Sequence, residues 1–167
     1  MTRVEEEAES SRRLALGLAL SVVVIVLDQL SKWWIVEVVM QPPRVIPVTS
    51  FFNLVMAWNR GVSFSLLWHE ADWMPWLLSA VAVVIVIFLL AWLRQAANRL
   101  VALALGLIIG GAVGNVVDRL RFGAVADFLD FHWAGWHFAA FNVADSAISV
   151  GVTLIVIDGL FGRSEKA

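Results

Sequence analysis

The sequence contains no cysteine, and only 16% of its 167 residues are charged. The absence of cysteine excludes disulfides, thiolate nucleophiles and cysteine-based metal sites. Soluble domains carry about 25% charged residues, so this scarcity of charge, beside 60% hydrophobic residues, indicates a membrane protein. A net charge of −2 without a basic block gives no indication of nucleic-acid binding. The three histidines lack metal-ligand spacing, so we expect no metal site.

Four apolar runs are present, and a membrane span takes about 20 residues. We therefore expect transmembrane helices at residues 14–36, 73–93, 99–118 and 140–160. They would form one membrane-embedded domain, residues 14–162, because the length leaves no room for a separate soluble catalytic domain. The polar residues 1–13 are expected to be a disordered tail, and residues 163–167 a second tail.

The segments between the spans differ in composition. Residues 41–72 begin with helix-breaking prolines and continue in short β-prone runs, which predicts a small sheet-like element between the first and second helices. Residues 119–139 are expected to be the loop that joins the third and fourth helices. The predicted fold is therefore mainly α, with four transmembrane helices and a small β-like cradle outside the membrane.

Lysine and arginine indicate the orientation. They cluster near both chain ends and between the second and third spans, and because cytoplasmic loops are enriched in these residues, we expect both termini in the cytoplasm. At about 1.5 Å per helical residue, Asp118 lies roughly 28 Å from Arg99, and Asp145 roughly 27 Å from Arg163. A hydrocarbon core is about 30 Å thick, so both aspartates are expected at its outer boundary. Asp28 would lie somewhat deeper in the same leaflet.

Asp127 and Asp145 are the candidate catalytic pair. Two carboxylates close together cannot both ionise easily, so one pKa rises and the pair shares a proton. One carboxylate can then activate water while the other protonates a carbonyl oxygen, as in aspartic proteases. A second interpretation of Asp145 is structural, because Asn142 is a good helix N-cap and an acid three positions later resembles a capping box. The residues alone leave both interpretations open.

Other polar residues have structural interpretations. Asp118 and Arg119 are adjacent, and Asp28 and Lys32 lie one helical turn apart, so each pair could be an ion pair. Gln29 and Ser31 could form hydrogen bonds between helices. Glycines recur every fourth residue from Gly106 to Gly114, which is typical of close helix packing in a bilayer.

Five short motifs occur in order along the chain. They are Asp28-Gln29-Leu30-Ser31-Lys32, Asn59-Arg60-Gly61-Val62-Ser63-Phe64, Gly114-Asn115-Val116-Val117-Asp118-Arg119, Val125-Ala126-Asp127-Phe128 and Phe141-Asn142-Val143-Ala144-Asp145-Ser146. Together, and with four spans, they resemble the bacterial lipoprotein signal peptidase family, also called signal peptidase II. The resemblance covers about residues 14 to 160. Arg60 departs from the family pattern, in which a small or polar residue is commoner after the asparagine, and this affects only local contacts.

The resemblance implies an aspartic endopeptidase of the bacterial inner membrane, with its active site at the periplasmic face. It implies that water attacks the peptide bond before a diacylglyceryl-modified cysteine of a prolipoprotein, with no metal, cofactor or covalent intermediate. It makes Asp127 and Asp145 catalytic. The supporting and substrate-contacting residues would be Asp28, Lys32, Asn59, Asn115, Asp118, Arg119 and Asn142. The expected partners are the lipidated substrate and membrane lipids, and the expected oligomeric state is a monomer.

Two alternatives belong to other functional classes. A small proton-coupled transporter could use the aspartates as a relay, although a relay is more natural near the membrane midplane than at one edge. A non-catalytic membrane assembly subunit would leave the costly Asp127 and Asp145 unexplained. Proteolysis by the wild type and its loss in folded asparagine variants would separate the enzyme from both.

Overall fold

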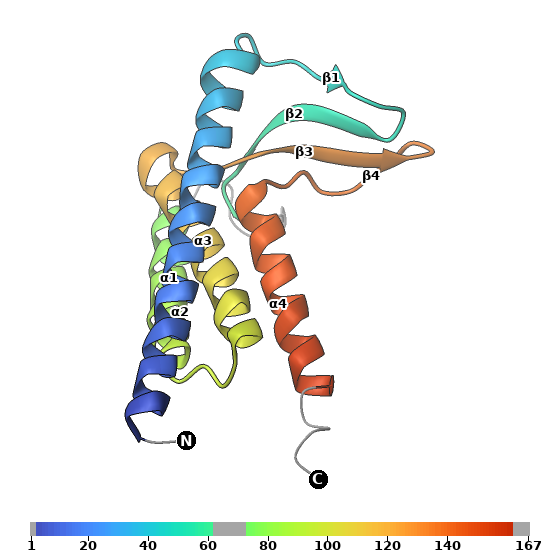
Figure 1. Ribbon diagram of the computed structural model, residues 1–167. Helices are drawn as coiled ribbons and strands as arrows, with labels where there is room; N and C mark the ends of the chain where they lie inside the picture. Colours follow the sequence, from blue (N-terminus) through green and yellow to red (C-terminus); the bar gives the residue numbers. More distant parts are fainter. Residues whose placement is uncertain (1–2, 62–72, 162–167) are drawn as a thin grey trace.

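The computed structural model describes residues 3–61 and 73–161 as a helical bundle with a sheet across one end (Figure 1). The helices are α1 (Arg3–Trp34), which continues as the π-helical turn η1 (Ile35–Val39), α2 (Met74–Leu93), α3 (Arg99–Phe122) and α4 (Val143–Phe161). Within the described ranges, four helices are long and apolar enough to cross a membrane. The predicted fold class is confirmed.

The sheet is antiparallel, with strands in the order β1-β2-β3-β4. Its strands are β1 (Ile46–Pro47), β2 (Phe52–Asn59), β3 (Val125–Trp133) and β4 (Trp136–His137). Figure 1 shows the sheet projecting sideways from the bundle, at the end opposite to the start of α1 and the end of α4. Ile35, Met40 and Phe128 form a buried cluster that joins the end of α1 to the sheet.

α3 is the central helix of the bundle. In α3, 61% of the apolar stretch is buried, against 22% or less in the other three helices. Its glycines allow this close packing, as predicted, since a Cβ on Gly106 would lie 2.5 Å from the carbonyl oxygen of Gly17 on α1. α3 begins at the N-cap Asn98, whose Oδ1 accepts a 2.9 Å hydrogen bond from the Val101 N–H.

The outer surfaces of α2 and α4 are apolar. Exposed aliphatic and aromatic side chains cover both helices, among them Val81, Val84, Ile87, Phe88, Val150, Val156 and Leu160. An exposed apolar surface of this extent is costly in water and is what lipid contact requires.

Two predictions about the connecting segments are wrong. The predicted tail of residues 1–13 is helical from Arg3 onward, and (i, i+4) ion pairs Arg3–Glu7 and Arg13–Glu9 support this polar helix. The segment 119–139 is not a simple loop, because α3 extends to Phe122 and β3 follows. The sheet is therefore built from both inter-helix segments, and β3 forms because it pairs with β2. The last part of the predicted sheet-like segment, residues 62–72, and the predicted tail at residues 163–167 lie outside the described ranges.

Candidate active site

Asp127 lies on β3, at the end of the bundle where the sheet meets the helices. Its side chain is buried, with 2% of its surface exposed. Oδ1 accepts a 2.7 Å hydrogen bond from Nδ2 of Asn142, and Oδ2 accepts a 3.0 Å bond from Nδ2 of Asn59. Burial raises the pKa of Asp127 from 3.8 to about 6, and the charge of Asp145 also raises it. The hydrogen bonds from the side-chain amides of Asn59 and Asn142 lower the pKa, but by less than burial raises it.

Asp145 lies in the first turn of α4, at the same end of the bundle. Its Oδ1 accepts a 2.8 Å hydrogen bond from Nδ2 of Asn115 on α3. Its backbone N–H donates to Oδ1 of Asn142 at 2.9 Å, and the Asn142 N–H donates back to Oδ2 of Asp145 at 3.2 Å. This reciprocal pair is a capping box, so the structural interpretation of Asp145 is confirmed.

Asn142 links the two aspartates. Its Oδ1 caps α4 through Asp145, while its Nδ2 donates to Asp127. The asparagine is fully buried, and both of its side-chain ends are engaged. The capping role of Asp145 therefore holds it beside Asp127, and the structural and catalytic interpretations are compatible.

A buried lysine lies behind the pair. Nζ of Lys32 forms 2.8 Å salt bridges with both Asp28 and Asp118, and these three side chains are almost completely buried. The predicted Asp28–Lys32 pair is confirmed. The predicted Asp118–Arg119 pair is wrong, because Asp118 pairs with Lys32 from α1. Adjacent residues on a helix point in different directions, which explains the error.

The two buried carboxylates hold the backbone next to the candidate pair. Oδ2 of Asp118 accepts the N–H of Ala126 at 3.1 Å, and Oδ1 of Asp28 accepts the N–H of Ala144 at 2.9 Å. Each alanine directly precedes one of the candidate catalytic aspartates. Because Lys32 forms a salt bridge with both Asp118 and Asp28, it holds these two hydrogen bonds to the backbone in a fixed position relative to each other. Sequence reasoning missed these bonds, because backbone amides leave no side-chain signal.

Two more residues connect the cluster. Oδ1 of Asn115 accepts from Nζ of Lys32 at 3.1 Å, so Asn115 joins the lysine to Asp145. Nε2 of Gln29 donates to Oδ1 of Asp118 at 2.9 Å, which is an inter-helix hydrogen bond of the kind predicted. Ser31 instead bonds within α1, to the carbonyl of Asp28 at 2.8 Å.

Arg119 differs from the other predicted site residues because its contacts are weak. Its Nη1 lies 3.5 Å from the carbonyl oxygen of Asn115, and its Nε is buried with no hydrogen-bond partner among the described residues. The guanidinium charge interacts with the charges of Asp145, Asp118 and Asp127. Within residues 3–61 and 73–161, no group of three or more His, Asp or Glu side chains is arranged to hold a metal ion.

Two carboxylates linked through Asn142 at one end of a four-helix membrane bundle are an arrangement that a membrane-embedded aspartic peptidase requires. Residues 20–161 match the family described as Signal peptidase (SPase) II. The chain therefore belongs to the signal peptidase II family, and the transporter and assembly-subunit alternatives are set aside.

Individual relatives agree with this assignment. The chain is 47% identical over 154 residues to the lipoprotein signal peptidases of Burkholderia vietnamiensis (strain G4 / LMG 22486) and Burkholderia multivorans (strain ATCC 17616 / 249), covering 90% of this chain and 91% of each relative. Its fold is similar to that of a bacterial membrane enzyme solved by the in meso method at 2.3 Å resolution. That match has a TM-score of 0.76 and 30% identity, and covers 90% of this chain and 91% of the other.

Proposed function

We propose that this protein cuts the signal peptide from prolipoproteins at the bond before a diacylglyceryl-modified cysteine, with Asp127 and Asp145 as the catalytic pair. The observation that carries the assignment of the pair is their convergence on Asn142, which hydrogen-bonds to both. Two strands (β2 and β3) and three helices (α1, α3 and α4) contribute to this cluster. Buried polar contacts of this number inside an apolar protein point to function.

The raised pKa of Asp127, about 6, supports a proton shared by the pair. In the reaction, the ionised carboxylate removes a proton from water, and the resulting oxygen attacks the carbonyl carbon of the scissile bond. The protonated carboxylic acid gives its proton to the carbonyl oxygen, which forms a neutral tetrahedral intermediate. When the C–N bond breaks, the carboxyl group that took a proton from water gives it to the leaving amine. A hydroxyl of the intermediate returns its proton to the other carboxylate, so the product carbonyl forms and the pair regains its shared proton.

The amides and the arginine have different roles in this proposal. Oδ1 of Asn59 accepts the Gly61 N–H at 2.9 Å, which turns its Nδ2 toward Asp127 and orients that carboxylate. Arg119 contacts the substrate, because its Nε is a buried donor without a partner and its guanidinium lies among the site's carboxylates. A backbone carbonyl of the bound peptide would satisfy that donor.

The active site faces the outside of the bacterial inner membrane in this proposal, and both termini are cytoplasmic. The lysine and arginine distribution supports this orientation. The start of α1 and the end of α4 lie together at the end of the bundle opposite to the sheet (Figure 1). A diacylglyceryl group could then stay in the outer leaflet while the peptide bond reaches water at the boundary, and a single copy of the chain suffices.

The test uses purified protein and a prolipoprotein with and without its diacylglyceryl group. We expect wild type to cut only the lipidated form, and Asp127→Asn and Asp145→Asn to lose cutting while unfolding cooperatively. Asp158→Asn is the matched control, because this carboxylate lies on α4 as well but at the other end, bonded to Asn98. Full activity in either site variant would remove the catalytic pair, and cutting of unlipidated substrate would remove the lipid requirement.

A further inference from the structure

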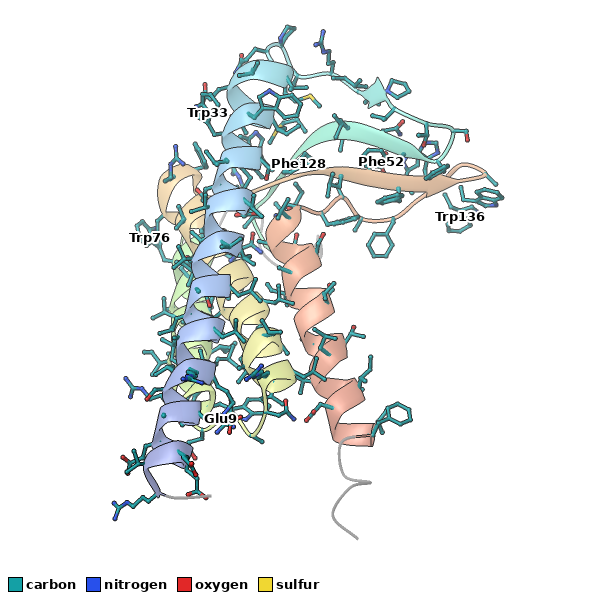
Figure 2. All side chains as sticks on the ribbon, viewed as in Figure 1. Glu9, Trp33, Phe52, Trp76, Phe128 and Trp136 are labelled. Atoms are coloured by element: carbon teal, nitrogen blue, oxygen red, sulfur yellow. The ribbon has the colours of Figure 1, made fainter. Side chains whose placement is uncertain are left out.

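The end of the sheet carries a group of exposed aromatic side chains, here called the aromatic tip. Its members are Phe51, Phe131, Trp133, Trp136 and Phe138. Trp133 is 78% exposed and Trp136 is 84% exposed, which is unusual for the largest apolar side chains. Together with His132 and His137 they line a hollow of about 590 Å³. Figure 2 shows Trp136 at the end of the sheet that lies farthest from the bundle.

The aromatic tip is held by specific contacts. β3 and β4 are joined by a tight turn in which Ala134 and Gly135 have φ of 49° and 84°. His137 binds the carboxylate of Asp130 through Nδ1 at 2.9 Å, and Asn53 of β2 donates to the same carboxylate at 2.9 Å. The buried Asp130 therefore ties the β3–β4 hairpin to the neighbouring strand. A hairpin held in this way presents its rings in a fixed position.

The apolar surface of the aromatic tip is continuous with the membrane-spanning part. Phe138 packs edge-on against Phe141, with ring centroids 6.0 Å apart, and α4 begins two residues later at Val143. β4 forms the edge of the sheet nearest to α4 (Figure 1). No Asp, Glu, Lys or Arg occurs from residue 131 to residue 144. The surface from the hairpin to the start of α4 can therefore meet lipid without burying a formal charge.

We propose that the aromatic tip is a membrane anchor that inserts into the headgroup–acyl boundary of the leaflet reached by the sheet end of the bundle. Tryptophan favours this boundary, because its ring is apolar and its N–H can hydrogen-bond at the wet side. The occupant is the bilayer itself, since the tip extends the lipid-facing surface of the spans. Trp133 follows Asp127 by six strand residues, or about 20 Å at 3.3 Å per residue. The anchor thus sets the height of Asp127 relative to the lipid.

The anchor is tested with a spin label, which the absence of cysteine makes simple. A single Ala134→Cys change between the two tryptophans carries the label, and Val45→Cys, an exposed position beside the opposite edge strand β1, is the matched control. The labelled protein is placed in phosphatidylcholine nanodiscs without substrate. Collision rates with oxygen, which enters lipid, and with a water-soluble nickel chelate are then measured by electron paramagnetic resonance.

We expect the label at Ala134 to be several-fold more shielded from nickel than the label at Val45, and more accessible to oxygen. Equal nickel accessibility at the two positions would overturn the proposal. Shielding that appears only after lipidated substrate is added would identify the substrate's acyl chains as the occupant, and would also overturn it. Shielding that requires several copies per nanodisc would assign the surface to a second copy instead.

The positioning role rests on the proposed function and has its own readout. In nanodiscs, the Trp133→Ser/Trp136→Ser variant should return the Ala134 label to water and raise the apparent KM for lipidated substrate several-fold, with kcat little changed. Trp92→Ser is the matched control, because it removes an exposed tryptophan from the C-terminal end of α2. It should change neither the accessibility of the Ala134 label nor the KM. An unchanged KM in the double variant would refute the positioning role. Failure of wild type to cut would refute the proposed function and leave the label measurement valid.

Discussion

The contribution of Asp127 to the stability of this protein should fall as the pH rises through its pKa. The folded state raises that pKa from 3.8 to about 6, mainly by burial. Below pH 3.8 the carboxyl group is protonated in both the folded and the unfolded chain, so its contribution is constant. Between 3.8 and 6 the unfolded chain loses this proton first, which favours unfolding. Above pH 6 the loss of stability is complete.

The size of the effect follows from the two pKa values. Each pH unit between them is worth about 1.4 kcal/mol, so the difference between about 6 and 3.8 amounts to about 3 kcal/mol. No large discount for solvent screening applies, because the Asp127 side chain is 2% exposed. A domain of this size shifts its Tm by about 2–4 °C per kcal/mol, so the expected change is about 6–12 °C.

The assay compares the Tm of wild type and Asp127→Asn in detergent from pH 4 to pH 8. Asparagine cannot ionise, and the titrating groups that do not interact with Asp127 contribute equally to both proteins, so their contribution cancels in the difference. The remaining difference reports Asp127 together with its coupling to Asp145. We expect the variant to gain about 2.4 kcal/mol relative to wild type as the pH rises from 4 to 7, because part of the total effect is already present at pH 4. The asparagine variant also loses a carboxylate oxygen that accepts hydrogen bonds from Asn59 and Asn142. This lowers its stability by the same amount at every pH and does not alter the slope of the Tm difference against pH. Parallel curves across this range would refute a buried, destabilised carboxylate at Asp127.

Three further predictions concern the residues around the pair. Lys32→Met leaves buried carboxylates without their cation and should cost about 3 kcal/mol or more, seen as a lower Tm; an unchanged Tm would contradict the buried salt bridges. Gly114→Ala places a Cβ 2.5 Å from Oδ2 of Asp28 and should lower both the Tm and the cutting rate. Gly159→Ala is the control, because Gly159 has open space around it, and it should lower neither. Equal effects of the two variants would contradict the close contact between Gly114 and Asp28. Asn142→Ser keeps a capping oxygen but loses the amide, so the unfolding free energy should change by only about 1 kcal/mol while substrate cutting falls at least tenfold; a parallel loss of both would contradict separate roles.

The helices could be predicted from the sequence because their signal is local. An uninterrupted apolar stretch such as Trp73 to Leu93 predicts a span without any knowledge of its neighbours. The polar start of α1 gave no such signal, since only charge pairs like Arg3–Glu7 support it. β3 could not be predicted for a different reason. Its pairing partner β2 lies far away in the sequence, and no local pattern marks such a contact.

The members of the candidate site could be predicted, but not most of their contacts. Asp127 and Asp145 followed from the cost of carboxylates in an apolar chain, and the asparagines followed from the family motifs. The structure brings these residues together. The partner of Asp118 was predicted from sequence neighbourhood as Arg119, whereas the three-dimensional fold supplies Lys32 from another helix. Hydrogen bonds between a side chain and a distant backbone, such as that from the Ala144 N–H to Asp28, form only once the helices have packed together.

The double role of Asn142 has a consequence for how this enzyme can change over time. The same side chain caps α4 and donates a hydrogen bond to the carboxylate of Asp127, so under the proposed mechanism any replacement is selected twice, once for folding and once for turnover. Mutations that restore stability elsewhere cannot rescue a variant at this position, because the missing amide would still be missing from the site. A bacterium under pressure from an inhibitor that binds against this amide would therefore have few viable substitutions there.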